Sequence, residues 1–333
     1  MRAQVPGKII LSGEHAVLYG QPAVAIAVNR YASCEMFAND GNRLEILLNG
    51  KHLDRGPMAL LLAERELTDG RYQNYLAGRS PVDDVVRSPK ALIQYAVAVF
   101  AEQENISLEQ GILLNICSEI PIGCGMGSSA AIILAVYEAL CQGFAIEWSR
   151  DQLYQAALRT ENLQHGRSSG IDPFTCLYGG AVRFTKGKAN SVAVEGLKFQ
   201  LVYTGKPACT TGECVDHVAK HFGQSNIWNI FGGITGQFLD GLEKGDLNMI
   251  AGAITDNQRL LEKIGVVPEK VAKFIEEVEF QDSAAKICGS GAVRGDAGGM
   301  VLVLTEVDLA PLIAHYGYES VSAEVDNHGT RCF

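Results

Sequence analysis

Apolar residues follow two different spacings along the chain, and each spacing predicts one kind of element. Short apolar runs predict strands at Lys8–Leu11, Pro22–Val28, Leu44–Leu48, Gly111–Ile116, Phe199–Tyr203, Met300–Leu304 and Tyr318–Val325. Apolar residues at helical spacing predict helices over Pro89–Glu102, Ser128–Leu140, Trp148–Gln164, Val215–Phe222, Ile227–Lys244, Leu247–Ile264 and Pro268–Val278. The strongly polar stretch Ala63–Asp84 is expected to be a loop or a weak helix. Strands alternate with helices in both halves, which leaves an α+β fold and a doubly wound parallel sheet both open.

The length of the chain favours two domains. Its 333 residues exceed the ~250–300 residues at which a single hydrophobic core stops growing. We predict one domain over residues 1–190 and a second over 191–333, with the boundary in the linker Thr185–Glu195.

Charge and cysteine usage exclude several classes of protein. The chain carries 28 Lys and Arg against 38 Asp and Glu, a net charge of −10, and lacks the basic clusters with which proteins bind nucleic acids. The nine cysteines include no CxxC pair, which argues against a zinc ribbon or a thioredoxin-type site. Charged residues interrupt the apolar N-terminal stretch, and no apolar run reaches the ~18–20 residues of a membrane span. We therefore expect a cytoplasmic protein with no membrane attachment.

The 36 glycines are clustered, and one cluster predicts a phosphate-binding loop. Residues 121–131 read PIGCGMGSSAA between a predicted strand and a predicted helix. Glycines at alternate positions let backbone N–H groups converge on an anion at the helix N-terminus, where the helix dipole is positive. The predicted cradle consists of Gly123, Cys124, Gly125, Met126, Gly127, Ser128, Ser129 and Ala130. The alternative is a tight turn with a serine N-cap.

A second cluster, residues 161–172, places two acids around a glycine-bracketed turn. Glu161 lies near the C-terminal end of a predicted helix, where the dipole disfavours an anion unless a cation is close. Asp172 follows eleven residues later. One acid is suited to holding Mg²⁺ and the other to accepting the proton of an attacking hydroxyl. The alternative is a solvated helix-end charge and an Asp-Pro turn.

A third cluster, residues 6–20, begins with a lysine in an apolar strand. Lys8 needs an acid or an anionic ligand in such surroundings, and pairing with Asp172 would keep that carboxylate ionised. The alternative for His15 is a structural histidine whose hydrogen bonds are satisfied within the protein, and the alternative for Glu14 is a turn residue. A fourth cluster, residues 286–299, contains five glycines and is expected to form a lid or wall of the same site.

Together these clusters resemble the GHMP kinase family, and most of all its mevalonate kinase branch. The four occur in the order typical of the family, and Lys206–Val215 is similar to its weaker threonine motif. The resemblance spans residues 6–299. It implies an α+β fold with an N-terminal domain like the second domain of ribosomal protein S5, a ferredoxin-like C-terminal domain, and an active site in the cleft.

The same resemblance implies ATP and Mg²⁺ as cofactors and a small-molecule acceptor, mevalonate. It makes Lys8 and Asp172 the catalytic pair, Glu161 and Ser129 (in preference to Ser128) the metal ligands, and Glu14, His15 and Thr211 neighbours of the substrate. The alternatives are another GHMP kinase acting on phosphomevalonate or a sugar, and a non-catalytic sensor of the same fold.

Two departures from the family pattern leave the acceptor open. Ser168 stands beside Arg167 where the family usually has proline, and Arg294 and Asp296 interrupt the C-terminal glycine run. An extra guanidinium would suit phosphomevalonate or another hydroxy acid. The apolar helix 227–242 is expected to be buried core, with the seam of a homodimer as the alternative.

Overall fold

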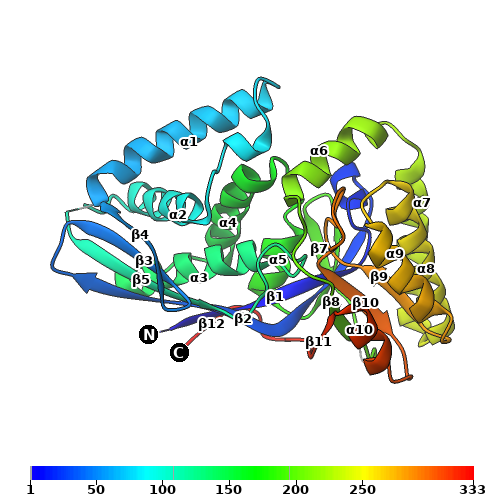
Figure 1. The fold of residues 1–333 in the computed structure, drawn as a ribbon. Coiled ribbons are helices and arrows are strands. Elements are labelled where there is room, and N and C mark those ends of the chain that lie inside the picture. Colours follow the sequence, from blue (N-terminus) through cyan, green and yellow to red (C-terminus); the bar gives the residue numbers. More distant parts are fainter. Residues whose placement is uncertain (1, 108, 195) are drawn as a thin grey trace.

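The computed structural model describes residues 2–107, 109–194 and 196–333 and contains two β-sheets flanked by helices (Figure 1). The strands are β1 Ala3–Ser12, β2 Ala23–Asn39, β3 Arg43–Leu48, β4 Lys51–Pro57, β5 Gly111–Ser118, β6 Ala181–Thr185, β7 Lys188–Ser191, β8 Gln200–Tyr203, β9 Ala284–Ile287, β10 Met300–Leu304, β11 Glu319–Val321 and β12 Arg331–Cys332. The helices are α1 Leu61–Leu76, α2 Pro89–Gln103, α3 Ser128–Gly143, α4 Arg150–His165, α5 Ile171–Tyr178, α6 Thr211–Phe222, α7 Ile227–Lys244, α8 Leu247–Lys263, α9 Glu269–Glu279 and α10 Ala310–Tyr316.

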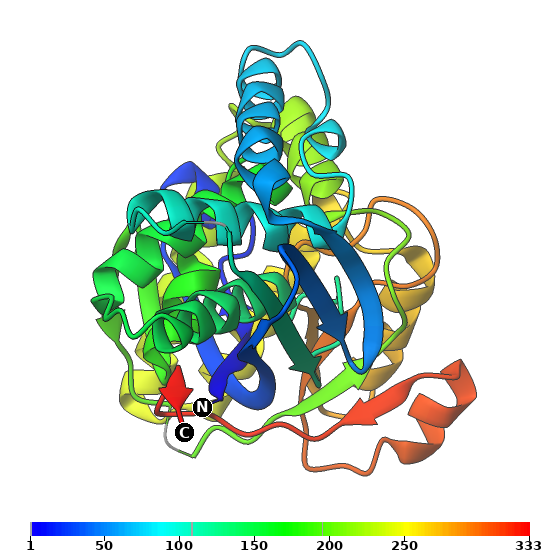
Figure 2. The ribbon, with the colours of Figure 1, turned by 90° about the vertical axis from the view of Figure 1, so that its left-hand side faces the viewer.

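The first sheet has the strand order β12-β1-β2-β5-β3-β4, and β6 and β7 extend from β2. β3 and β5 run parallel, whereas the other described pairings in this sheet are antiparallel. Helices α2, α3 and α4 lie on one face of it (Figures 1 and 2). α3 packs on β1 and β2 and also on α2 and α4. It is therefore apolar on nearly every side, as a helix enclosed between two layers must be.

The second sheet is antiparallel, in the order β11-β8-β10-β9, and is accompanied by α7, α8 and α9 (Figure 1). Phe231 and Phe238 of α7 are fully buried, and Ile234 is 8% exposed. Most of the apolar stripe on this helix is thus core, as expected, while Ile230 projects outward with 53% exposure.

Most predicted elements are present, with differences at their ends. The polar stretch Ala63–Asp84, expected to be a loop or a weak helix, is helical as far as Leu76, because α1 begins two residues before it. β2 continues eleven residues beyond the predicted end at Val28. The predicted domain boundary falls at β7, close to the change from the first sheet to the second, and Glu195 at the end of the predicted linker lies outside the described residues, as do Met1 and Leu108.

The two ends of the chain meet in the first sheet. β12 pairs with β1, and backbone N–H groups of Arg2 and Phe333 donate to each other's carbonyl oxygens at 2.9 and 3.0 Å. Figure 1 shows both termini at the same edge. In the described ranges 2–107, 109–194 and 196–333, no helix combines the length and apolar character needed to cross a membrane.

Candidate active site

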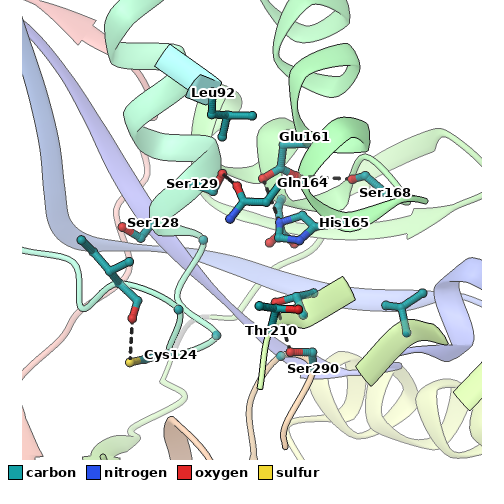
Figure 3. A pocket seen from close by; sticks show the side chains of 18 of the residues that line it. Leu92, Cys124, Ser128, Ser129, Glu161, Gln164, His165, Ser168, Thr210 and Ser290 are labelled. Carbon is teal, nitrogen blue, oxygen red and sulfur yellow. Dashed lines mark hydrogen bonds and ion pairs between the residues drawn. The ribbon is translucent and has the colours of Figure 1, made fainter. Parts of the chain in front are cut away.

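A cavity of about 430 Å³ lies where the first sheet, the glycine loop and the second half of the chain meet (Figure 3). Its wall includes most of the residues singled out in the sequence: Lys8, Glu14, His15, Gly123, Cys124, Gly125, Gly127, Ser128, Ser129, Glu161, Asp172 and Thr211. The side chains of Met126 and Ala130 belong to the apolar core instead, so within the glycine loop they anchor the backbone.

Lys8 and Asp172 form an ion pair on this wall. The Nζ of Lys8 lies 2.9 Å from Oδ2 of Asp172 and donates to the carbonyl oxygen of Gly125 at 3.4 Å. The Lys8 side chain is 2% exposed and that of Asp172 27%, so the carboxylate faces the cavity while the ammonium group lies behind it. Burial by itself lowers the pKa of Lys8, but Asp172 and, more weakly, Glu161 raise it to a net value above the ordinary one. Lys8 is therefore a permanent positive charge beside the carboxylate.

The glycine loop packs tightly on its neighbours at two positions. Gly125 has φ +85°, and a Cβ there would lie 2.5 Å from the carbonyl oxygen of Cys288. Gly127 has φ +70°, and a Cβ there would lie 2.9 Å from Cγ of Lys8. Side chains at either position would push the loop away from β1 or from the second glycine cluster. The glycines thus hold the loop against the lysine strand on one side and residues 288–289 on the other.

The N-terminus of α3 opens onto the cavity without a side-chain cap. Its first N–H groups have no partner within the helix and are free to bind an anion. The hydroxyl of Ser129 donates to Oε1 of Gln164 at 2.6 Å, whereas the buried Oγ of Ser128 has no hydrogen-bond partner among the residues that the structure describes. An unpaired buried hydroxyl at a helix N-terminus fits a site that a ligand completes.

Glu161 of α4 lines the cavity, is 1% exposed, and has few compensating contacts among the described residues. Its side chain accepts a hydrogen bond from Oγ of Ser168 at 3.3 Å, and Nε2 of His165 lies 3.7 Å from its second oxygen (Figure 3). Ser168 also accepts from the N–H of Gly170 at 3.2 Å. The serine that departs from the family pattern therefore steadies the turn between the two acids. A carboxylate this buried, with these two contacts among the described residues and the charge of Lys8 nearby, fits a divalent cation, which proteins commonly hold with one or two acids and phosphate oxygens.

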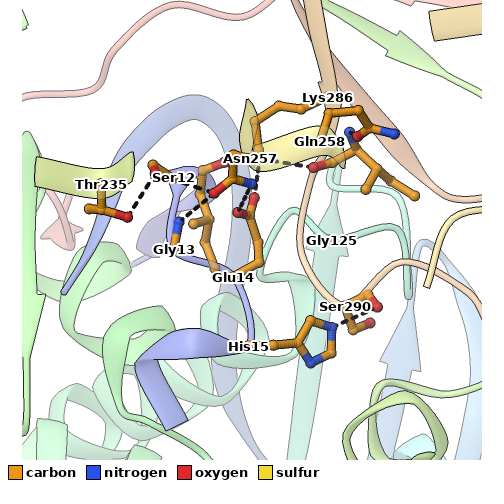
Figure 4. A network of polar contacts seen from close by, with 12 residues as sticks. Ser12, Gly13, Glu14, His15, Gly125, Thr235, Asn257, Gln258, Lys286 and Ser290 are labelled. Atoms are coloured by element: carbon orange, nitrogen blue, oxygen red, sulfur yellow. Dashed lines mark hydrogen bonds and ion pairs between the residues drawn. The ribbon is translucent and has the colours of Figure 1, made fainter. Parts of the chain in front are cut away.

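Glu14 reaches the cavity wall, but its carboxylate is engaged in a buried network (Figure 4). Lys286 of β9 donates to one of its oxygens, and Nδ2 of Asn257 donates to the other at 3.2 Å. Oδ1 of Asn257 accepts in turn from the N–H of Gly13 at 3.2 Å and from Oγ of Ser12 at 3.3 Å. This network joins the turn after β1 to α8 and β9, so Glu14 links the two halves of the chain.

His15 and Thr211 lie on either side of residues 289–290. Nε2 of His15 is 3.0 Å from the carbonyl oxygen of Ser290, and burial lowers the pKa of His15 to about 4 although that hydrogen bond opposes the change. The hydroxyl of Ser290 donates to Oγ1 of Thr211 at 3.2 Å. The imidazole is therefore neutral near pH 7, and both side chains contact the second glycine cluster at the cavity.

The two unexplained arginines have different surroundings. Arg294 is ion-paired with Glu213 of α6 at 2.7 Å and does not line the cavity. Arg167 lines the cavity, is exposed, and forms no ion pair with any described residue. Lys206 lines it as well. The sequence analysis included Lys206 in the threonine motif but gave no role of its own to Lys206, Gln164 or Lys286. A lysine in the apolar strand Ala284–Ile287 nevertheless requires an acidic partner, as Lys8 does.

Comparison with known proteins identifies the family. The model of the GHMP kinases N terminal domain matches residues 91–180. The chain is 33% identical over 293 residues to a mevalonate kinase of Archaeoglobus fulgidus, and this alignment covers 87% of the chain and 89% of that protein. The chain belongs to the GHMP kinase family. It is therefore a small-molecule kinase of the kind that uses ATP.

Solved structures of this family share the fold over nearly the whole chain. A mevalonate kinase of Methanococcus jannaschii superposes with a TM-score of 0.78 at 22% identity, covering 98% of both chains. A phosphomevalonate kinase of Streptococcus pneumoniae, solved with phosphomevalonate and AMPPNP, gives a TM-score of 0.75 at 16% identity and covers 98% of this chain and 100% of that one. The α+β GHMP kinase fold expected from the sequence is confirmed.

Proposed function

We propose that this GHMP kinase transfers the γ-phosphoryl group of ATP to the primary hydroxyl of mevalonate and forms 5-phosphomevalonate. The observation that carries the proposal is the 2.9 Å ion pair of Lys8 and Asp172 beside an uncapped helix N-terminus. A carboxylate facing the cavity is placed to orient a hydroxyl and take its proton, and the adjacent ammonium group stabilises the negative charge that develops. The name of the Archaeoglobus fulgidus relative supports mevalonate as the acceptor.

The remaining roles follow from the cavity wall. Backbone N–H groups of residues 123–129 hold the phosphates, and Glu161 and Ser129 would hold Mg²⁺, with Gln164 releasing the Ser129 hydroxyl. When bound, Mg²⁺ would supply positive charge that offsets the negative charge of the phosphate groups. Residues 1–190 carry the phosphate loop and the catalytic pair, and residues 191–333 carry the second glycine cluster that closes the cavity.

Arg167 supports an acidic acceptor over a sugar. A guanidinium that lines the cavity without an acidic partner is suited to a bidentate contact with a carboxylate. His15 and Thr211 line the same part of the cavity as residues 289–290 and are assigned to the acceptor. Glu14 acts through the loop geometry that its ion pair with Lys286 maintains.

The test is a coupled ADP-release assay over mevalonate, phosphomevalonate, galactose and homoserine. We expect mevalonate to give by far the highest kcat/KM. Asp172→Asn is expected to retain ATP binding and to lose about 10²–10⁴-fold in kcat, the range for removal of a general base. Asp151→Asn, an exposed change of the same type in α4, is the matched control and should leave kcat unchanged. Turnover near wild type in Asp172→Asn would refute the assigned base, and a preference for another acceptor would refute the substrate.

A further inference from the structure

Two thiols face each other at the N-terminus of α6, on the edge of the active-site cavity. The Sγ atoms of Cys209 and Cys214 are 3.5 Å apart. Thr210 caps the helix, and its hydroxyl and the side chain of Glu213 form a reciprocal capping box. Cys209 precedes the cap and Cys214 lies one turn into the helix, at the two positions whose side chains normally meet as a hydrophobic staple. The local helix geometry thus holds the two sulfurs together.

The two cysteines differ in access. Cys209 is half-buried and lines the cavity, whereas Cys214 is 0% exposed. Burial raises the pKa of Cys214, and the neighbouring Cys209 raises it further, so this thiol ionises less readily than a free cysteine. A small oxidant that enters the cavity reaches Cys209 first and finds Cys214 directly behind it. Cys209 is thus placed to react with the oxidant, and Cys214 is placed as the resolving thiol that then forms a disulfide with it.

We propose that Cys209 and Cys214 are a redox-sensitive dithiol, which a peroxide converts to a disulfide that slows the kinase. In the first step the Cys209 thiolate attacks one oxygen of hydrogen peroxide, the O–O bond breaks, and a sulfenic acid and hydroxide form. In the second step the sulfur of Cys214 displaces water from that sulfenic acid, and its proton leaves with the water. Two thiols and one peroxide thus give one disulfide and two waters, and a dithiol reductant reverses the change.

The disulfide would disturb contacts that position the cavity wall. A disulfide needs an S–S length near 2.05 Å, so the two sulfurs must approach by about 1.5 Å. Cys214 now donates to the carbonyl oxygen of Gly291 at 3.5 Å, and the N–H of Val293 donates to Cys209 at 3.4 Å. Oxidation removes the first donor and shifts the acceptor of the second. Both contacts hold the second glycine cluster, whose Ser290 hydroxyl donates to Thr211.

We therefore expect oxidation to lower kcat/KM by about tenfold or more, since a displacement near 1 Å at a substrate-positioning group can cost as much as 10²-fold. Bound substrates should slow the oxidation, because Cys209 is reached through the cavity. The size of the activity loss rests on the proposed function, whereas formation of the disulfide does not.

Peptide mapping tests the disulfide whatever the acceptor is. The purified full chain is treated with a few equivalents of hydrogen peroxide, alkylated, and cut after glutamate. Cleavage after Glu213 separates Cys209 from Cys214, so the two peptides stay joined only through a disulfide. We expect the joined peptides after peroxide and their separation by dithiothreitol. Free, alkylated thiols at both positions after peroxide would overturn the proposal.

Activity measurements with matched variants test the consequence. Wild type should lose and regain kcat/KM with peroxide and dithiothreitol on the acceptor that the assay identifies. Cys209→Ser and Cys214→Ala should be insensitive to peroxide, and Cys117→Ser, a change at an exposed thiol of β5, should respond as wild type does. A disulfide with unchanged kcat/KM, or equal peroxide sensitivity in Cys209→Ser, would overturn the proposal.

Discussion

Replacing Lys286 by methionine tests how strongly the buried network joins the two halves of the chain. The Lys286 side chain is 0% exposed and that of Glu14 1%. Besides Glu14, the Nζ of Lys286 donates to the carbonyl oxygens of Ile10 at 3.1 Å and Ile287 at 2.9 Å. Methionine keeps most of the side-chain volume but removes the charge and all three hydrogen bonds.

The expected loss is about 3–5 kcal/mol in the free energy of unfolding, because Glu14 is left as a buried charge without its cation. Asn257 still donates to Glu14, which favours the lower half of that range. A double variant, Glu14→Gln with Lys286→Met, removes the stranded charge and should recover at least about half of the loss. Because folded proteins are stable by only about 5–15 kcal/mol, the single variant should unfold at a clearly lower urea concentration than the wild type.

Urea unfolding followed by circular dichroism measures these differences. Lys273→Met is the matched control, since Lys273 pairs with Glu269 in the open, at 63% and 84% side-chain exposure, and should not change the unfolding midpoint. The reasoning is refuted if Lys286→Met unfolds like Lys273→Met, or if the double variant is less stable than the single one.

Two further variants test residues of the cavity wall, Arg167 for binding of the acceptor and His15 for the pH dependence of stability. Arg167→Gln should raise KM for mevalonate about tenfold or more with a smaller change in kcat, because charge-assisted hydrogen bonds to a carboxylate contribute about 1.5–3 kcal/mol. Arg294→Gln is the control, since Arg294 lies outside the cavity, and it should leave KM unchanged. Equal effects of the two variants on KM would contradict the assignment of Arg167 to the acceptor. His15 has a pKa of about 4 when folded and near 6.5 when unfolded, so the unfolded state binds more protons between these values and stability falls as pH drops through that window. Between pH 6.5 and 4 the free energy of unfolding of the wild type should therefore fall by about 3 kcal/mol more than that of His15→Asn. Asparagine is chosen because it tolerates the φ of 55° at this position. Urea unfolding at several pH values checks this, with exposed His52→Asn as control; parallel pH profiles for wild type and His15→Asn would disprove it.

The ion pair of Lys8 and Asp172 was predictable because both residues carry strong local signals. A lysine in an apolar strand requires an anion, and Asp172 follows a glycine-bracketed turn, so their contact needed only the chain order of the motifs. Glu14 was harder. The family resemblance implies a place near the substrate, and Glu14 does line the cavity. Nothing in the sequence indicated its pairing with Lys286, a contact between residues 272 positions apart. Local patterns cannot decide which of two distant buried groups will meet.

The elements that escaped prediction are short or carry opposing signals. α5 has eight residues and begins with Ile171-Asp172-Pro173, which reads as a turn, although proline in the first turn of a helix costs no hydrogen bond. β9 has four residues and contains Lys286, so its apolar run is interrupted. β12 has only two residues and exists through its pairing with β1. In each case a tertiary contact, not the local pattern, decides the structure.

The pairing of β12 with β1 has a consequence for the order in which this protein is made. The pairing joins Ala3 to Cys332 and Gln4 to Arg331, so the outer edge of β1 at these two residues is covered only after residues 331–332 have been synthesised. Until then the start of β1 presents an unpaired edge, of the kind that can pair with other chains. Farther along the strand, the N–H of Lys8 donates to the carbonyl oxygen of Met126 at 2.9 Å and does not depend on β12. Because loop closure over so many residues is slow to occur, we expect this edge to be the last part of the sheet to form. A nascent chain thus carries the first residues of β1 on an exposed edge until Arg331 and Cys332 have been synthesised.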